Sequence, residues 1–285
     1  MVSNVTSTAT VLRGKRILIT GPTAGIGRQI ALDLAALGAD LILGCRDLTR
    51  GARTAEEIRA ATGAGSIAVL QLDTSSQRSI RDFARTLRAS HPRLDVLVNN
   101  AGVAQGEHRT SADGIELTFA TNVLGYFLLT RELLDVLRAS APARIVNVSS
   151  AFIDEPDLDD LEFSRRRYDG LRAYAQSKAC NRLLTWALAR RLEGSGVTAT
   201  AYAPGFVAGT ELSRDLPPAI KDAYRTRVGR TAEEGADTAV WLASSAAVEG
   251  ISGKFFMDRR ELPCELREVS TEEALWAECE RYVGF

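Results

Sequence analysis

The chain has 285 residues, of which 45% are hydrophobic and 25% are charged, a composition typical of a folded globular protein rather than a disordered or fibrous one. The 35 basic and 36 acidic residues nearly cancel, which disfavours the broad positive field that nucleic-acid binding requires. No apolar run approaches the ~20 residues needed to span a bilayer, and the polar start lacks the pattern of a signal peptide. We therefore expect a soluble, cytoplasmic protein without a membrane span.

The histidine and cysteine content narrows the chemistry further. There are only two histidines, His91 and His108, which excludes an HExxH zinc site and leaves little material for a Ser-His-Asp triad. The cysteines are far apart and form no CxxC pair, so neither a disulfide framework nor a zinc-thiolate site is indicated; they are Cys45, Cys180, Cys264 and Cys279. We expect no metal, and an acid or base other than histidine.

Short β-branched runs alternate along the chain with segments of helical period, which predicts βαβ units around a parallel sheet. Strands are predicted at residues 16–20, 40–44, 67–71, 94–99, 144–149, 197–202 and 254–256, and helices at 25–37, 49–61, 77–89, 115–138, 171–193 and 232–243. No repeat, low-complexity tract or linker divides the chain. The expected fold is a single α/β domain over residues 1–285, a Rossmann fold whose doubly wound, seven-stranded parallel sheet carries helices on both faces.

Three segments, residues 151–170, 208–230 and 258–285, fit the alternation poorly. A polar arm is expected at residues 1–13, and a short helix at 271–282 within the tail. Ligands of such a sheet bind beyond the carboxyl ends of the strands, so segment 208–230 is predicted to be a substrate lid. The apolar residues in and next to this segment are Phe206, Leu212, Leu216, Pro217, Pro218, Ile220 and Tyr224.

The first chemical signal directly follows the first predicted strand, where residues 20–27 read TGPTAGIG and then a helix begins. Glycines at this spacing allow a tight turn and let the backbone approach a pyrophosphate, while the start of the helix aims free N–H groups at it. The alternative is a glycine-rich turn with no ligand. The position between a strand and a helix favours the phosphate cradle.

The end of the second predicted strand reads GCRD and places Arg46 roughly 20 residues downstream, where an acidic residue would bind the ribose diol of NAD. A guanidinium instead stacks on adenine and binds a 2′-phosphate, which favours NADP(H). Arg28, just past the glycines, could add to the phosphate site. The alternative is that Arg46 is a solvated surface charge and Asp47 takes the diol.

The second signal is Tyr174-Ala-Gln-Ser-Lys178 inside a predicted helix, where residues four apart share one face and the ammonium lies beside the phenol. Of the 35 basic residues 31 are arginine, yet a lysine stands four residues after Tyr174. A compact ammonium can approach a phenol and a ribose hydroxyl together, which a planar guanidinium does poorly.

Further motifs follow in a fixed order: NNAG at 99–102, Asn122 within a helix, Ser149-Ser150 after the fifth strand, and Pro204-Gly205. With TGxxxGxG and YxxxK, this order resembles the short-chain dehydrogenase/reductase superfamily from about Lys15 to Phe256. The amino-acid sequences of several segments are most similar to those of the branch that contains retinol dehydrogenases. That branch uses NADP(H) on lipophilic alcohols and carbonyls.

The resemblance implies a role for each catalytic residue. Tyr174 would be the general acid and base, and the Lys178 ammonium would favour its ionised form. Ser150 would hydrogen-bond the substrate oxygen, where charge develops, and Asn122 would anchor a water that connects Lys178 to solvent. Ser150 is preferred to Ser149 because the last serine usually carries this role in the family, and strand alternation turns the two side chains to opposite faces.

The resemblance and the motifs also predict the cofactor site. Asp73 and Thr74 should lie at the adenine, and the segment after Pro204 should pass the nicotinamide, with Thr210 near its amide or the pyrophosphate. The full predicted set is Gly21, Thr23, Ala24, Gly25, Ile26, Gly27, Arg46, Asp73, Thr74, Asn100, Ala101, Gly102, Tyr174, Lys178, Pro204, Gly205, Val207 and Thr210.

The predicted function is an NADP(H)-dependent oxidoreductase that transfers a hydride between nicotinamide and a hydrophobic alcohol, ketone or aldehyde. One alternative is non-redox biosynthetic chemistry with bound NADP(H), such as cyclisation, dehydration or epimerisation. Another is a catalytically silent protein that senses NADP(H). Relatives often pair through the helices that correspond to residues 115–138 and 171–193, so a homodimer or homotetramer is expected.

Overall fold

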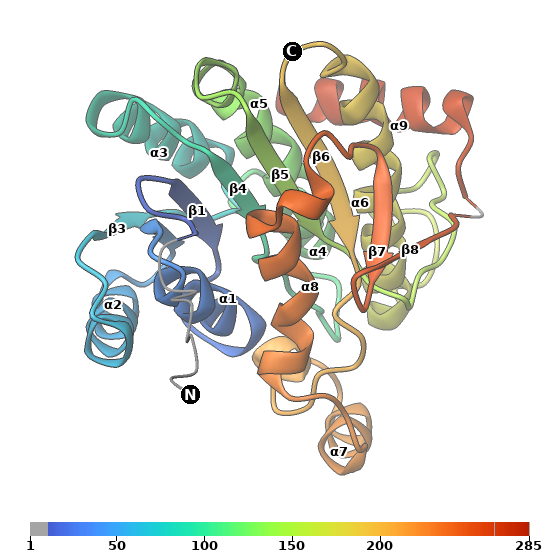
Figure 1. Ribbon diagram of the computed structural model, residues 1–285. Coiled ribbons are helices and arrows are strands. Elements are labelled where there is room, and N and C mark those ends of the chain that lie inside the picture. The colour runs from blue at the N-terminus through green and yellow to red at the C-terminus, as the bar shows by residue number, and fades with distance from the viewer. Residues whose placement is uncertain (1–10, 265, 285) are drawn as a thin grey trace.

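The computed structural model describes residues 11–264 and 266–284, so residues 1–10 of the expected polar arm and positions 265 and 285 lie outside the described residues. The described chain folds around one sheet with the strand order β3-β2-β1-β4-β5-β6-β7-β8 (Figure 1). Its strands are β1 (Arg16–Thr20), β2 (Asp40–Cys45), β3 (Ile67–Gln71), β4 (Val96–Asn99), β5 (Ala143–Val148), β6 (Val197–Tyr202), β7 (Lys254–Met257) and β8 (Arg260–Leu262). The first seven pair in parallel, and β8 pairs antiparallel with β7.

Helices cover both faces of the sheet, as a doubly wound fold requires (Figure 1). The helices α1 (Gly25–Ala36), α2 (Leu48–Thr62) and α8 (Ala232–Ser244) pack on one face. On the other face lie α3 (Gln77–Ser90), α5 (Gly125–Ala139) and α6 (Gly170–Arg191), and α9 (Val269–Val283) packs against α6. The expected α/β class and the doubly wound arrangement are therefore confirmed.

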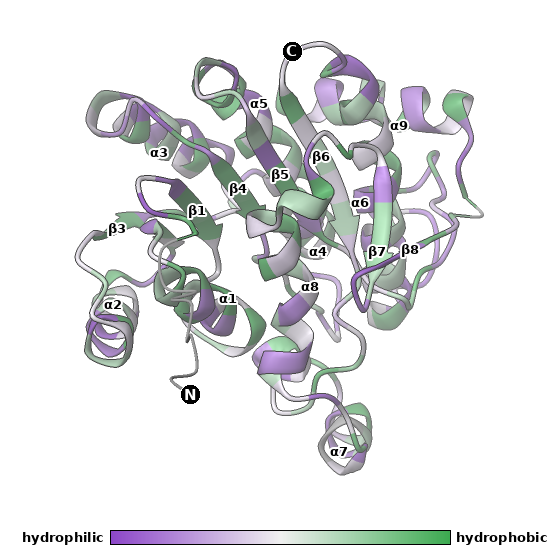
Figure 2. Ribbon diagram, viewed as in Figure 1, coloured by the Kyte–Doolittle hydropathy of each residue, from purple (hydrophilic) through white to green (hydrophobic). Residues whose placement is uncertain are grey.

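The strands form because their side chains are apolar on both sides, and alternation sends neighbours into two separate cores. In β1, Ile17 and Ile19 join the core beneath α1, α2 and α8, whereas Leu18 joins the core beneath α3, α5 and α6. Figure 2 shows the central strands as the most hydrophobic part of the ribbon, with hydrophilic residues on the surrounding helices. Burial on both faces of the sheet stabilises the frame that carries the loops at its edge.

The predicted count of seven strands is corrected by β8, which forms a hairpin with β7. The two-residue turn consists of Asp258 and Arg259, with φ of +53° and +56°, so both are in the left-handed region that tight hairpins need. Such turns usually contain glycine or asparagine, and arginine at the second position gives no turn signal in the sequence. Here Arg259 is held by its backbone N–H bond to Thr238 and its ion pair with Asp237.

The predicted helix 115–138 is also corrected, because it consists of three pieces. A three-residue α4 (Leu117–Phe119) leads into a π-helical turn (Ala120–Leu124), which continues as α5. The lid segment contains an unpredicted helix, α7 (Pro218–Thr226), whereas the tail helix expected at 271–282 is confirmed as α9. Hydrophobic periodicity marks helical residues but does not distinguish an α turn from a π turn.

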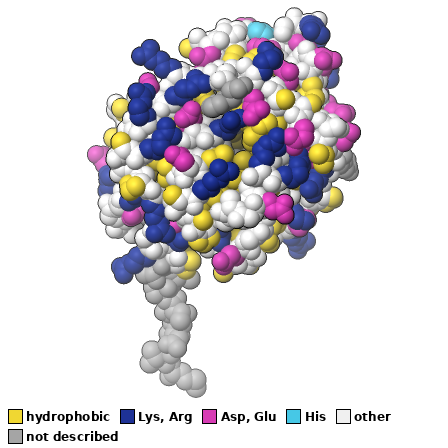
Figure 3. Space-filling model, turned by 90° about the horizontal axis from the view of Figure 1, so that it is seen from above, with side chains coloured by type: hydrophobic (Ala, Val, Ile, Leu, Met, Phe, Trp, Pro, Cys, Tyr) yellow, Lys and Arg dark blue, Asp and Glu magenta, His cyan; other side chains and the backbone are white. Residues whose placement is uncertain are grey.

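The surface carries charges of both signs. Figure 3, which views the end of the molecule opposite α7, shows Lys and Arg side chains interspersed with Asp and Glu. Within residues 11–264 and 266–284, no helix is both long and apolar enough to cross a membrane, and no group of three His, Cys, Asp or Glu side chains could hold a metal ion.

Candidate active site

A cleft of about 1070 Å³ lies at the carboxyl ends of the central strands, where the loops after β1, β4, β5 and β6 meet. The strand order reverses between β1 and β4, and such a reversal opens a crevice for a ligand. Every residue predicted to hold the cofactor lines this cleft. So do Ser150, Tyr174 and Lys178 of the predicted catalytic set, whereas Asn122 lies directly behind its wall.

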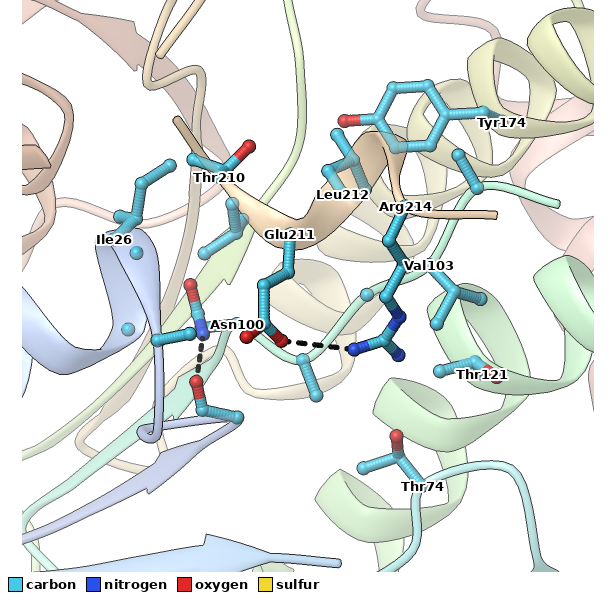
Figure 4. Close-up of a pocket in the computed structure, with 18 of the residues that line it drawn as sticks. Ile26, Thr74, Asn100, Val103, Thr121, Tyr174, Thr210, Glu211, Leu212 and Arg214 are labelled. Carbon is cyan, nitrogen blue, oxygen red and sulfur yellow. Dashed lines mark hydrogen bonds and ion pairs between the residues drawn. The ribbon is translucent and has the colours of Figure 1, made fainter. Parts of the chain in front are cut away.

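The glycine turn forms one end of the cleft. Gly21 follows β1 with φ of +65°, and a Cβ on Gly27 would lie 2.3 Å from both Asn100 Nδ2 and the Gly21 oxygen. Asn100 Nδ2 donates to the Gly21 oxygen at 3.2 Å (Figure 4) and to the Thr20 oxygen at 2.8 Å, which fastens the turn to the end of β4. Because no side chain caps α1 at Gly25, its first backbone N–H groups remain available to an anion. The turn therefore fits a phosphate group.

Arg46 lines the cleft at the end of β2 with an exposed side chain. Its neighbour Asp47 accepts the Arg50 backbone N–H at 3.0 Å and so caps the start of α2. Asp47 also lines the cleft, and one of its two carboxylate oxygens makes this cap bond. Arg28, in contrast, pairs with Glu57 at 2.8 Å and does not line the cleft.

Tyr174 and Lys178 both reach the cleft from α6, which begins after Asp169 caps its first turn. The Lys178 ammonium nitrogen lies 5.7 Å from the centre of the Tyr174 ring and donates to the Val148 oxygen at 3.0 Å. The side chain is 3% exposed, and burial lowers the pKa of Lys178 to about 7. Lys178 can therefore lose and regain a proton near neutral pH.

The two serines after β5 differ in their surroundings. Ser149 is buried and donates its hydroxyl to the Lys178 backbone oxygen at 2.7 Å. Ser150 lines the cleft on the opposite side of the chain, and its hydroxyl oxygen accepts the Phe152 backbone N–H at 3.0 Å. Accepting that bond leaves the Ser150 proton available for a substrate oxygen.

Asn122 stands in the π-helical turn, a local irregularity that is frequent at functional sites. Its side chain exchanges two hydrogen bonds with the backbone of Val103, at 2.8 and 2.9 Å, and donates to Ser177 at 3.0 Å. A Cβ on Gly102 would lie 3.3 Å from Asn122 Oδ1 and 3.6 Å from Lys178 Nζ. Asn122 thus holds the loop after β4 in place beside Lys178.

Backbone hydrogen bonds hold the lid segment at two places, at its base and at Asp215. The Arg230 N–H donates to the Phe206 oxygen at 2.8 Å, and the Ala208 N–H donates to the Arg230 oxygen at 3.0 Å. Farther along, the Gly106 N–H donates to the Asp215 oxygen at 2.9 Å. Residues 209–214 therefore form a strap across the cleft between two backbone anchors.

The lid segment carries more charged residues in the cleft wall than its apolar residues led us to expect. Of the apolar residues named for this lid, Phe206 and Leu212 line the cleft, and Leu216 is buried. The side chain of Tyr224 lies outside the described residues. The charged residues that line the cleft from this segment are Glu211, Arg214, Asp215 and Arg227. Thr210 lies against the glycine turn, with its Cγ2 3.3 Å from an ideal Cβ on Gly25.

Several residues of the cleft wall were not predicted from the sequence. They follow strands β2, β4 and β5 or begin α6, and they are Arg50, Val103, Ala104, Gln105, Arg109, Phe152 and Leu171. No motif marks them, but their position just after strand ends was a signal, because loops at this edge of a sheet surround the ligand. His108 makes a 3.0 Å contact with the Glu162 oxygen and does not line the cleft.

Comparison with known proteins places the chain among its relatives. The family model for short chain dehydrogenases matches residues 15–221. The chain is 41% identical to human retinol dehydrogenase 14, over 96% of this chain and 88% of the relative, and 40% identical to human retinol dehydrogenase 13, over 95% and 85%. Among solved structures, an uncharacterized protein from Mycobacterium Paratuberculosis superimposes with a TM-score of 0.76 at 31% identity, covering 95% of this chain and 94% of that one. A complex of Pseudomonas aeruginosa RhlG with NADP in its active site has a TM-score of 0.68 at 29% identity, covering 88% and 96%.

These matches agree with the motifs and with the arrangement of the cleft. They support oxidoreduction at an alcohol or carbonyl group with a nicotinamide cofactor. The chain belongs to the short-chain dehydrogenase/reductase family, in the branch that resembles the retinol dehydrogenases.

Proposed function

We propose that this protein is an NADP(H)-dependent oxidoreductase that interconverts a hydrophobic alcohol and its ketone or aldehyde. The observation that carries the proposal is the meeting of Tyr174, Lys178 and Ser150 in the same cleft as the glycine turn. The neighbourhood of the three side chains suits a substrate oxygen, and the turn suits a dinucleotide phosphate. When bound, the nicotinamide would supply or accept the hydride.

In carbonyl reduction, Ser150, Tyr174 and Lys178 would act on the substrate oxygen and its proton. The Ser150 hydroxyl donates a hydrogen bond to the carbonyl oxygen and stabilises the charge that develops there. Tyr174 gives its phenolic proton to the same oxygen, which completes the alcohol. Lys178 stabilises the resulting phenolate and, with a pKa of about 7, can pass a proton back to it. Oxidation of an alcohol would use the same groups in reverse.

The positioning of these groups would depend on Asn122 and Ser149. Asn122 holds Val103 and Ser177, one residue before Lys178, whereas Ser149 bonds the backbone oxygen of Lys178 itself. The side-chain bonds of Asn122 are thus directed at protein groups. A water anchored by Asn122, as the resemblance implies, would therefore use its backbone.

Three features support NADP(H) over NAD(H). Arg46 is exposed in the cleft wall, where a 2′-phosphate would lie, and Asp47 is engaged as the cap of α2. RhlG, which shares the fold, is described as a complex with NADP.

An apolar substrate is supported by Val103, Leu171 and Phe206 in the wall. The cytoplasmic location and the dimer or tetramer stay predictions.

The test is NADPH oxidation measured with purified protein and carbonyl compounds graded in size and apolarity, each repeated with NADH. We expect NADPH to be consumed with apolar aldehydes or ketones, with a higher kcat/KM than with NADH. Substrate turnover without any change in NADPH would support the non-redox alternative. NADPH binding without turnover of any compound would support the sensor alternative.

A further inference from the structure

The strap over the cleft carries a carboxylate shared by two arginines. One Glu211 oxygen accepts from Arg50 at 2.8 Å, and the other accepts from Arg214 at 3.1 Å. All three side chains line the cleft, and Figure 4 shows the Glu211 carboxylate reaching down from the strap between Asn100 and Arg214. A negative group therefore stands in the space that the proposed function gives to the phosphates of a dinucleotide.

The two arginines belong to opposite sides of this contact. Arg50 lies in the first turn of α2, four residues after Arg46, and Arg214 belongs to the strap itself. The Arg214 guanidinium also pairs with Asp215 at 3.2 Å, next to the backbone anchor of the strap at Gly106. If Arg50 turns toward a bound phosphate, Glu211 still pairs with Arg214. Neither Arg50 nor Glu211 is then left without a charged partner.

The bridge is of a kind that a phosphate can replace. The side chains of Arg50, Glu211 and Arg214 are 45%, 47% and 42% exposed, and ion pairs between such exposed groups stabilise a protein little. A phosphate carries more charge than a carboxylate, and it can accept two parallel bonds from a guanidinium, whereas Arg50 makes one hydrogen bond to Glu211. Exchange of Glu211 for a phosphate at Arg50 is therefore favourable.

We propose that Glu211 competes with the 2′-phosphate of NADP(H) for Arg50, so that Glu211 holds Arg50 whenever that phosphate does not. The inference rests on the proposed function, because it assumes that the cleft takes this dinucleotide. It assigns to Glu211 a competing role: the carboxylate lowers the affinity for NADP(H) and couples the strap to the adenosine end of the site.

The test compares equilibrium binding of NADPH and NADH to the full chain, followed by nucleotide fluorescence. Arg50→Gln should weaken NADPH binding roughly tenfold, the loss expected for a charge-assisted hydrogen bond, and NADH binding less than about threefold. Glu211→Gln should tighten NADPH binding roughly threefold, and this gain should disappear in the Arg50→Gln, Glu211→Gln double variant. Titration with 2′,5′-ADP against 5′-AMP repeats the comparison without a nicotinamide.

Glu57→Gln is the matched control, because Glu57 is an exposed carboxylate on α2 that pairs with Arg28 and does not line the cleft. It removes the same charge without releasing a cleft arginine, so its NADPH affinity should stay within about twofold of the wild type. The inference is overturned if Arg50→Gln binds NADPH as the wild type does, or if Glu211→Gln fails to tighten binding. If the wild-type protein binds neither dinucleotide, the proposed function fails as well.

Discussion

The Lys178 side chain is buried although it can carry a positive charge. Burial of the charged form lowers the stability of the folded protein. The Lys178 side chain is 3% exposed, and its ammonium donates to a neutral partner, the Val148 oxygen. The ammonium nitrogen also lies 5.5 and 5.7 Å from the centres of the uncharged Tyr126 and Tyr174 rings. Burial lowers the pKa of Lys178 from 10.5 to about 7. Between these two values the unfolded chain binds a proton that the folded chain has released, so the stability rises with pH across this window.

Lys178→Met should therefore stabilise the protein while it removes turnover. At pH 6 the wild-type lysine is protonated in both states and carries its full burial penalty, so the variant should be more stable by on the order of 2 kcal/mol. The advantage should shrink as the pH rises from 7 toward 10. Urea unfolding at pH 6 and pH 9 measures it.

Lys254→Met is the matched control for this comparison, since Lys254 is an exposed lysine that pairs with Glu261 at the sheet edge. Its effect on stability should stay within about 0.5 kcal/mol at both pH values. Equal stability differences at pH 6 and pH 9 for Lys178→Met would contradict the lowered pKa.

In the glycine turn between β1 and α1, two glycines determine the path of the backbone. Gly21 adopts a left-handed backbone, and Gly27 leaves room for the Asn100 amide, which closes the turn against β4. A side chain at either position would compete with the backbone that has to approach a phosphate. The turn, the start of α1 and the end of β4 therefore act as one unit.

Gly27→Ala should disrupt this unit, because the added Cβ would lie 2.3 Å from Asn100 Nδ2 and from the Gly21 oxygen. We expect a loss of about 1–3 kcal/mol in the free energy of unfolding and at least a tenfold loss of NADPH affinity. Gly65→Ala, at a glycine with nothing within 4 Å of an added Cβ, is the control and should change neither quantity appreciably. Wild-type NADPH binding by Gly27→Ala would count against the phosphate cradle.

The elements that the sequence predicted well are those whose signal is local. Strands β1, β3 and β6 match their predicted bounds because they are short runs rich in apolar and β-branched residues, such as RILIT, that end at turns. The turn of the β7–β8 hairpin, in contrast, depends on contacts of Arg259 with α8, which no nearby residue signals. The same holds for the cleft wall. Motifs indicated Tyr174, Lys178 and the glycines, whereas the contact between Glu211 and Arg50 joins residues far apart in the sequence, which only the folded chain brings together.

Helix α9 packs on α5 and α6 and covers the side of these helices that faces away from the sheet. Trp276 contacts Phe127 of α5 with ring centres 4.8 Å apart, and Arg190 of α6 pairs with Glu272 and Glu273 at the start of α9. Tyr282 donates to Glu162 at 2.7 Å and ties the helix to the loop after β5. The tail thus covers parts of α5 and α6, the helices through which pairing was expected.

Trp276→Ala should measure how much this cover stabilises the fold. Trp276 is 7% exposed, and loss of a buried tryptophan costs about 3–5 kcal/mol, so urea unfolding should shift strongly. Arg281→Ala, at an exposed residue of the same helix that pairs with Glu278, should shift the free energy of unfolding by less than about 0.5 kcal/mol. Similar unfolding midpoints for both variants would show that α9 contributes little.

Tyr174→Phe tests whether a phenol in the nucleotide cleft exchanges the proton of the reaction. The matched control is Tyr168→Phe, whose hydroxyl bonds Glu116 and does not line the cleft. With a carbonyl substrate that the wild type reduces, Tyr174→Phe should lose at least about 100-fold in kcat and keep its NADPH affinity within about threefold, while Tyr168→Phe keeps its turnover. A Tyr174→Phe variant that reduces the carbonyl at the wild-type rate would show that Tyr174 is not the proton donor.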